Sequence, residues 1–412
     1  MTDIDVRDVQ RATVWKGAVP AGELVRIGEG TSFRYLDAYV ASSGRPVAHS
    51  LPLDVGEVTA PAGAVPPFFA GLLPEGERLL SLSRRVKTSL DDMMSLLLAV
   101  GSDAVGDVRV LPVDADPTIV APPILDGDLQ GLGEADFNAL FERSIGVDAG
   151  AGDDVALAGV QDKVSASVIS FPVTDVAGGG AAILKLNPQR YPGLVENESW
   201  CLTLASDAEL AVAQHQVVHD RHGKSALLVH RFDRVSVDGV VMSLEQEDAA
   251  QLAGRYPGQK YRMRSIEVAR AVREVAHSRP LAMRELIALF AASYLMGNGD
   301  LHAKNVSVLT SLDGETRLSP AYDLVSTVAY IPDDRMALEF EGRDNRLRRT
   351  DFINFGERVG VPAKAVARRL DHVCDVIETY LDRVGDIGLD DAASSRISRT
   401  MRERLTRFTL RA

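Results

Sequence analysis

Residues 297–307 read GNGDLHAKNVS, and we organise the rest of the chain around this stretch. An apolar run with helical spacing, residues 285–296, leads into it, and a run of β-type residues, 306–310, follows it. The stretch is therefore predicted to be a short polar loop between a helix and a strand. It carries four side chains that can do chemistry: Asp300, His302, Lys304 and Asn305.

The sequence spacing of two of these residues matches a known motif. Asp300 and Asn305 follow the order D-x-x-x-x-N, which is the spacing of a kinase catalytic loop. In such a loop the carboxylate accepts the proton of the attacking hydroxyl, while an amide oxygen nearby reaches a metal on the phosphates. The alternative is that Asp300 is only a helix cap or a solvated loop residue.

A β-hairpin is predicted directly after the loop. An Asp-Gly pair, Asp313-Gly314, separates two β-type runs, which is a strong turn signal. Asp323 then lies eighteen residues after Asn305. In protein kinases a catalytic loop is followed along the chain by a hairpin and then by an isolated aspartate, which is the second metal-binding carboxylate. Asp323 alone would be an ordinary turn residue, but the order of the motifs favours the catalytic interpretation.

The composition of the chain argues against a nucleic-acid-binding, membrane-spanning or secreted protein. The chain has 412 residues, enough for two or three domains, and its net charge of -13 disfavours strong direct binding to nucleic acid. The arginines within residues 343–349 are interpreted as a solvated basic face. The sequence has no run of eighteen apolar residues, so no membrane-spanning helix is expected. The polar N-terminus argues against secretion. Cys201 and Cys374 stand far apart, which favours a reducing, cytoplasmic compartment without disulfides.

The N-terminal residues predict a small antiparallel module. Residues 12–60 alternate apolar and polar side chains between Gly and Ser breaks. Helices are predicted over 77–85 and 90–100, and a strand over 106–112. Residues 113–134, rich in Pro, Gly and Asp, are interpreted as a boundary.

A second motif precedes the β-type run 164–171. A small, flexible loop ahead of a strand could lay backbone N–H groups along phosphates, although a loop with one glycine is ordinary when taken alone. The loop consists of Ala158, Gly159, Val160, Gln161, Asp162 and Lys163.

Lys185 ends the next apolar strand, 182–186, where a kinase places the lysine that contacts the ATP phosphates. The helix predicted near 198–206 offers Glu196 or Glu198 as its ion-pair partner. A further strand, 227–230, leads to Arg231 and Phe232, where the hinge of a two-lobed kinase would fall. Helices are predicted to start at 245–248 and to cover 265–277, 284–296, 366–384 and 396–408.

With these motifs in order, the chain resembles the HipA-family serine/threonine kinases, the toxin components of bacterial toxin–antitoxin pairs. The resemblance spans roughly residues 15–385, because the N-terminal β-rich module and the segment LLPE at 72–75 also fit. The matching pieces are AGVQDK at 158–163, ILK at 183–185, ENE at 196–198 with Cys201, RFDR at 231–234, QED at 246–248 with Gln251, KY at 260–261, residues 297–307, and Tyr322 with Asp323.

The resemblance implies an α+β, two-lobed protein-kinase-like fold with an N-terminal β-rich subdomain and a mostly helical C-terminal lobe. It divides the chain into the β-rich subdomain (1–115), the kinase N-lobe with the phosphate loop and the ATP-gripping lysine (116–235), and the helical C-lobe with the catalytic loop (236–412). It makes Asp300 the proton acceptor and Asn305 and Asp323 the Mg²⁺ ligands. The ATP-binding residues that it implies are Ala158, Gly159, Val160, Gln161, Asp162, Lys163, Lys185, His230, Arg231, Phe232, His302, Lys304 and Tyr322.

The resemblance also implies partners. Family members phosphorylate a Ser or Thr of proteins that include aminoacyl-tRNA synthetases, and several are restrained by a small DNA-binding antitoxin that supplies most of the DNA affinity. Two positions depart from the family pattern. Ala156 stands where a self-phosphorylated Ser or Thr is common, which puts regulation at that site in doubt, and His230 replaces a common Glu.

Two other classes of function stay open. A kinase-like fold can instead phosphorylate a small molecule, and transfer of label to metabolites rather than to protein would identify that case. A non-enzymatic module that only binds nucleotide is the second alternative, and ATP binding without turnover would favour it.

Overall fold

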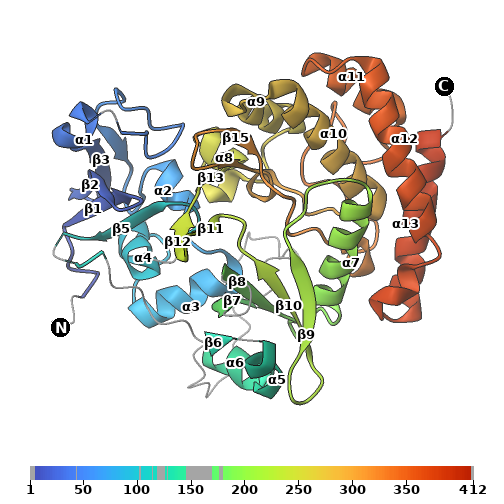
Figure 1. The fold of residues 1–412 in the computed structure, drawn as a ribbon, viewed down its shortest axis with the longest axis horizontal. Helices are drawn as coiled ribbons and strands as arrows, with labels where there is room; N and C mark the ends of the chain where they lie inside the picture. The colour runs from blue at the N-terminus through green and yellow to red at the C-terminus, as the bar shows by residue number, and fades with distance from the viewer. Residues whose placement is uncertain are drawn as a thin grey trace.

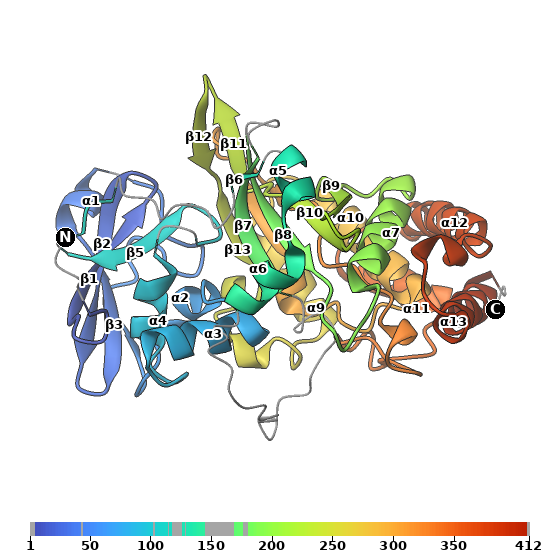
Figure 2. The same cartoon turned by 90° about the horizontal axis from the view of Figure 1, so that it is seen from below.

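The computed structural model describes residues 5–409 except residues 43, 102–103, 114, 118–125, 128, 145–168 and 176–179. A β-rich N-terminal part, a central sheet and a helical C-terminal part follow one another along the molecule (Figures 1 and 2). The mixture of sheets and helices confirms the α+β class that the sequence predicts. Among the described helices, none has both the length and the apolar character needed to cross a membrane.

The N-terminal part is built on an antiparallel sheet with the strand order β4-β3-β2-β1-β5. Its strands alternate as expected, and Ala12 and Val14 of β1 are fully buried against Phe33 and Phe69 in one core. The elements are β1 (Arg11–Lys16), β2 (Val19–Ile27), β3 (Gly30–Tyr35), α1 (Asp37–Ala41), β4 (Val58–Ala60), α2 (Pro67–Gly71), α3 (Gly76–Val86), α4 (Met93–Val100) and β5 (Val108–Pro112).

The central sheet has the order β6-β7-β8-β10-β9, in which β6 and β7 are parallel and the other neighbours antiparallel. Strand β10 is buried on both faces. Ala226 and Leu228 belong to the core formed with α5 and α6, whereas Leu227 and Val229 belong to the core formed with α7. The elements are β6 (Asp126–Gly127), α5 (Leu129–Glu134), α6 (Phe137–Ser144), β7 (Ile169–Asp175), β8 (Gly180–Leu186), α7 (Leu194–Asp207), β9 (His215–His219) and β10 (Ser225–His230).

Helix α10 (Arg279–Met296) is the centre of the C-terminal part. It is apolar on nearly every side, which is the pattern of a helix enclosed by others. Its Phe290 and Tyr294 contact the rings of Phe340, Phe352 and Phe408. The other elements are β11 (Arg234–Val237), β12 (Val240–Ser243), β13 (Glu245–Asp248), α8 (Ala249–Leu252), α9 (Ser265–Val275), β14 (Ser307–Thr310), β15 (Thr316–Leu318), α11 (Arg349–Arg358), α12 (Ala363–Tyr380) and α13 (Asp391–Thr409).

The hairpin predicted after the loop 297–307 is confirmed, because β14 and β15 pair antiparallel around Asp313-Gly314. The helix start predicted at 245–248 was wrong. These residues form β13, which pairs with β14 in the register Glu245 to Thr310 and Asp248 to Ser307. The acidic side chains are held in the extended conformation by partners distant in sequence, and α8 begins only after Asp248, which caps it.

Candidate functional site

The loop 297–307 leaves α10 through Gly297, whose φ of 84° suits glycine. A Cβ there would lie 2.6 Å from Cγ2 of Val328, so a side chain does not fit. The backbone N–H of Asp300 donates to Oδ1 of Asn298 (2.8 Å), and Nδ2 of Asn305 donates to the carbonyl oxygen of Asp300 (3.1 Å). These two bonds hold the predicted base and the predicted metal ligand in one tight loop.

The carboxylate of Asp300 is buried and has a phenol beside it. The hydroxyl of Tyr261 donates to Oδ1 of Asp300 at 3.0 Å. Burial and the nearby charge of Asp300 raise the pKa of Tyr261, which keeps the phenol protonated and able to donate. The ring of Tyr261 also meets that of His302 edge-on, with centroids 5.0 Å apart. Burial, helped by Lys260, lowers the pKa of His302 to about 3, so this imidazole is neutral at pH 7.

Tyr322 fastens the segment after β15 to the loop 297–307. Its hydroxyl donates to the carbonyl oxygen of Lys304 (2.6 Å) and lies 2.5 Å from Oγ of Ser307. The next residue, Asp323, has a φ of 53°, a left-handed conformation that is uncommon for a residue other than glycine. Such backbone conformations are often found at functional sites. Asp323 is thereby held close to the loop that carries Asn305.

Lys185 lies on the face of β8 that looks toward α7, because Leu184 and Leu186 fill the core on the opposite face. Its Nζ is 2.7 Å from Oε1 of Glu198 and forms a second ion pair with Asp323. Burial acts to lower the pKa of Lys185, but the carboxylates of Asp323 and Glu198 outweigh it and raise that pKa. One ammonium therefore joins the central sheet, α7 and the segment after β15.

The structure decides between the two glutamates considered for Lys185. Glu198 is the partner, whereas Oε2 of Glu196 accepts a hydrogen bond from Nδ2 of Asn187 (2.9 Å). Asn197 between them has a role that the sequence did not suggest. Its Oδ1 accepts from the backbone N–H of Ser326 (2.9 Å), and its Nδ2 donates to the carbonyl oxygen of Ser326 (3.1 Å). Asn197 directly, and Glu198 through Lys185, thus hold the segment that contains Asp323.

The residues predicted at the hinge, His230, Arg231 and Phe232, do not all face the Lys185 side of the sheet. The guanidinium of Arg231 is buried and donates to both oxygens of Asp233 (3.0 and 2.8 Å) and to the carbonyl oxygen of Ala104 (3.0 Å). The ring of Phe232 lies 5.6 Å from that of Tyr322, on the side of β10 where Lys185 is found. His230 shares its strand parity with Ala226 and Leu228, which face the opposite core.

The N-terminal part contacts the loop 297–307 at Lys304. The ammonium of this residue donates to the carbonyl oxygen of Gly71 (3.1 Å) and lies 3.3 Å from Oε1 of Glu75. Glu75 was not among the predicted site residues. Its segment, LLPE at 72–75, fits the family pattern, but its distance along the chain from the loop leaves no local pattern that could have revealed the contact.

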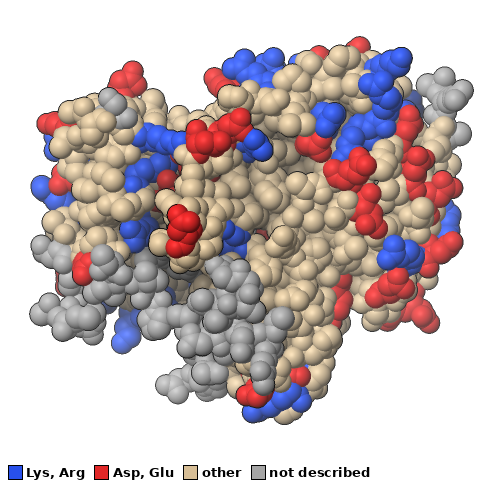
Figure 3. Space-filling model, in the orientation of Figure 1, with Lys and Arg blue, Asp and Glu red and all other residues tan. Residues whose placement is uncertain are grey.

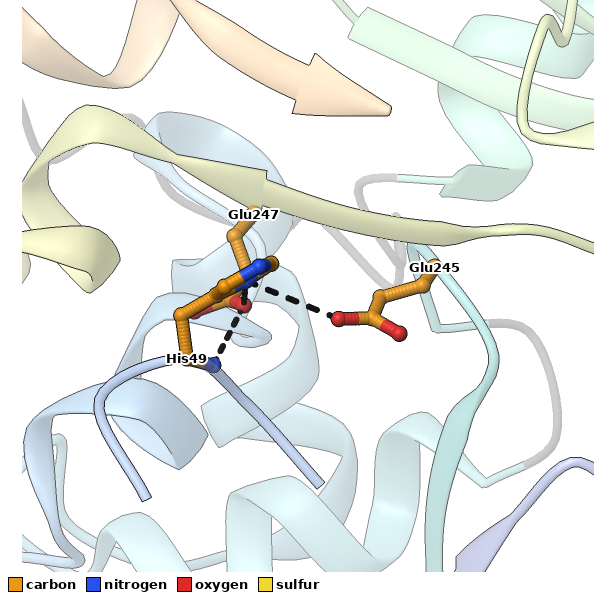
Figure 4. Close-up of side chains that lie close together, drawn as sticks. All are labelled: His49, Glu245 and Glu247. Carbon is orange, nitrogen blue, oxygen red and sulfur yellow. Dashed lines mark hydrogen bonds and ion pairs between the residues drawn. The ribbon is translucent and has the colours of Figure 1, made fainter. Parts of the chain in front are cut away.

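A second cluster of ionisable groups joins the N-terminal part to β13 (Figure 4). Nδ1 of His49 lies 2.6 Å from Oε1 of Glu247 and 3.6 Å from Oε1 of Glu245. A histidine and two carboxylates could hold a metal ion, but the ammonium of Lys16 lies 2.9 Å from Oε2 of Glu245 and 3.0 Å from Oδ1 of Asp107. This buried cation already pairs with Glu245, so the cluster is better described as a charged contact between two parts of the protein.

Among the predicted site residues, the structure brings together Lys185, Phe232, Tyr322 and Asp323 with the loop of Asp300 and Asn305. An amide oxygen and a carboxylate, those of Asn305 and Asp323, are the hard oxygen ligands that Mg²⁺ accepts. The Asp323 side chain is 35% exposed, and the donor chemistry of the two residues fits a magnesium ion. The predicted phosphate loop, 158–163, and Ala156 lie outside the described residues.

Comparisons with known proteins identify the family of the chain. The family model of the HipA-like C-terminal domain matches residues 155–381, and that of the HipA N-terminal domain matches residues 12–111. Two proteins of Sinorhizobium fredii, named "Putative kinase Y4mE" and "Putative kinase Y4dM", are 30% and 32% identical to the chain. Each match covers 84% of the chain, and 86% and 83% of the two relatives.

A solved structure shows the same fold. It is that of HipA in the Shewanella oneidensis complex of HipA, HipB and operator DNA, with a TM-score of 0.73 at 20% identity and 96% of both chains covered. This likeness confirms the predicted two-lobed, kinase-like arrangement with its additional N-terminal subdomain.

Proposed function

The chain belongs to the HipA family, and from this premise we propose that it is a protein kinase that transfers the γ-phosphoryl group of ATP to a serine or threonine. One observation carries the proposal. Lys185, paired with Glu198, also contacts Asp323, and Asp323 follows the tyrosine that is bonded to the catalytic loop. This contact supports a single site formed by a cation, two candidate Mg²⁺ ligands and a candidate base.

Catalysis would come from positioning and from electrostatic stabilisation, since phosphoryl transfer requires little covalent chemistry from the protein. Asp300 would accept the proton of the attacking hydroxyl on its carboxylate, and the hydrogen bond from Tyr261 orients that carboxylate. Lys185 would bind the ATP phosphates through its ammonium, which stays charged beside its carboxylate partners. Asn305 and Asp323 would hold Mg²⁺, which neutralises negative charge on the phosphates when it is bound.

Aromatic residues would bind the rest of the nucleotide. Phe232 and Tyr322 form a ring pair on the Lys185 side of the sheet, where an adenine could contact their faces. The proposed nucleotide contacts also include His230, Arg231, His302, Lys304 and the loop residues Ala158 to Lys163, all of which stay predictions from the family pattern.

We further propose that this kinase is the toxin of a toxin–antitoxin pair and arrests growth by phosphorylating a protein such as an aminoacyl-tRNA synthetase. The support is its family, together with the Shewanella oneidensis HipA structure, which contains HipB and operator DNA. A small antitoxin would supply most of the DNA affinity, because the chain carries a net charge of -13. The face in Figure 3 likewise shows acidic and basic side chains interspersed over the helical part.

A cytoplasmic location fits an ATP-dependent enzyme whose two cysteines, Cys201 and Cys374, are free and buried.

The proposed activity is tested by incubating the protein with γ-labelled ATP, Mg²⁺ and a cell extract, then hydrolysing labelled protein to identify the modified amino acid. Phosphoserine or phosphothreonine is expected. Label found only in small metabolites would favour a small-molecule phosphotransferase, and ATP binding without any turnover would favour a non-enzymatic module.

A further inference from the structure

Glu75, in the N-terminal part, contacts two lysines next to the proposed base. Its Oε2 lies 2.5 Å from Nζ of Lys260, and its Oε1 lies 3.3 Å from Nζ of Lys304. We propose that Glu75 is a positioning residue of the catalytic loop, which it holds through Lys304. The N-terminal subdomain would then be part of the active site. The inference rests on the proposed kinase function.

The contact is made by closely packed elements. Helix α2 lies beside α8 (Figure 1) and ends at Gly71, whose carbonyl oxygen accepts a hydrogen bond from Lys304. Nε2 of Gln251 donates to the carbonyl oxygen of Phe68 (2.9 Å), and a Cβ on Gly71 would lie 2.5 Å from Cγ of Gln251. There is no room for a side chain at Gly71, so α2 can approach α8 closely enough for Glu75 to reach the loop.

Charge explains why a carboxylate is needed at this position. The side chains of Lys260 and Lys304 are each only 12% exposed, and a buried ammonium without a partner is strongly unfavourable. Burial acts to raise the pKa of Glu75, but Lys304 and Lys260 outweigh it and lower that pKa to about 2. Asp248 is a weaker substitute, since its Oδ2 lies 3.9 Å from Lys304 and burial raises its pKa to about 6. Glu75 is therefore the carboxylate that stays ionised across the physiological range.

Lys304 is fixed at both ends. Its ammonium is held by Glu75 and Gly71, and its carbonyl oxygen accepts the hydrogen bond from Tyr322. Since Lys304 stands between Asp300 and Asn305 in sequence, releasing its ammonium should displace the base and the proposed metal ligand. Lys185 and the aromatic pair lie on other elements and should keep their positions. On this proposal the ammonium of Lys304 positions the loop, and the contact of Lys304 with the nucleotide that the family pattern predicts would not be made by this ammonium.

The test compares Glu75→Gln and Glu75→Asp with a matched control in the same subdomain, Asp92→Asn. Asp92 also forms a half-buried ion pair, with Nη2 of Arg26 at 2.9 Å, but it does not contact the catalytic loop. The full-length variants are assayed for kcat with ATP and Mg²⁺, for the Kd of ATP, and for the midpoint of thermal unfolding. Glu75→Gln is expected to lower kcat about 10²-fold, the effect of a misplaced catalytic group, with the Kd of ATP changed less than about twofold. Glu75→Asp should recover part of kcat.

Asp92→Asn is expected to lower the unfolding midpoint and leave kcat near that of the wild type. The proposal is overturned if Glu75→Gln keeps the wild-type kcat, or if it loses stability and ATP affinity together with kcat. If the wild type itself transfers no phosphoryl group, the proposed function fails and the inference falls with it. An active wild type beside an equally active Glu75→Gln variant overturns the inference alone.

Discussion

Nζ of Lys185 on β8 lies 2.7 Å from Oε1 of Glu198 on α7, and both side chains are shielded from water. The same ammonium contacts Asp323 of the C-terminal part. This lysine therefore fixes the central sheet relative to the segment that would bind metal, as a strand lysine and a helix glutamate do in protein kinases.

Replacing Glu198 tests whether its ion pair with Lys185 supports both ATP binding and stability. Glu198→Gln is expected to weaken ATP binding about tenfold and to lower the free energy of unfolding by about 3 kcal/mol, since it leaves a buried ammonium with one fewer carboxylate. The control is Glu196→Gln on the same helix, whose partner is Asn187. ATP titration and urea unfolding measure both effects, and equal results for the two variants would contradict the assignment.

Replacing the proposed base should remove activity without removing the fold. Asp300→Asn keeps the volume of the buried side chain but cannot accept a proton, so kcat should fall about 10²–10⁴-fold with the Kd of ATP unchanged. Asp313→Asn, on the exposed turn of the β14–β15 hairpin, serves as the control and should match the wild type. Phosphoryl transfer at a near-normal rate by Asp300→Asn would assign the base to another residue.

Asp233 should matter for stability. Its carboxylate accepts from Arg231, from Arg234 (2.7 Å) and from the backbone N–H of Gly106 (2.9 Å), and all of it is buried. Asp233→Asn should lower the free energy of unfolding by about 3–5 kcal/mol, because it leaves buried guanidinium groups uncompensated. Urea unfolding beside Asp238→Asn, an exposed turn residue of the β11–β12 hairpin, checks this, and a loss no larger than that of the control would refute it.

The His49 cluster should make stability depend on pH. Burial acts to lower the pKa of His49, but the hydrogen bond to Glu247 and its charge outweigh burial and raise the pKa above the ordinary 6.5. A raised pKa in the folded state contributes stability below pH 6.5 that is lost as pH rises through the folded value. Wild type should therefore exceed His49→Gln in unfolding free energy near pH 6, and the difference should shrink toward pH 8. A difference that is constant with pH would contradict this.

Local patterns carried much of the sequence prediction. The apolar run before Gly297, the Asp-Gly turn and the spacing of Asp300 and Asn305 depend on neighbours in sequence, and the structure forms the helix, loop and hairpin that they predict. The sequence likewise predicted that Lys185, at the end of an apolar strand, pairs with Glu196 or Glu198 of the next helix, and the structure pairs it with Glu198.

Long-range contacts could not be predicted in this way. Residues 245–248 form a strand because Glu245 and Glu247 meet Lys16 and His49 of the N-terminal part, whereas their local sequence favours the start of a helix. Nothing near Glu75 in the sequence indicates that Lys304, more than two hundred residues later, is its partner. Such pairs depend on how separate elements pack, which periodicity does not report.

The most direct test of the central claim is transfer of label from γ-labelled ATP to extract proteins in the presence of Mg²⁺, with wild type beside Asp323→Asn. The account expects labelled phosphoserine or phosphothreonine in one or a few proteins with the wild type, and loss of that label with the variant or after chelation of the metal. Equal labelling by both proteins, or no transfer by the wild type despite measurable ATP binding, would contradict it.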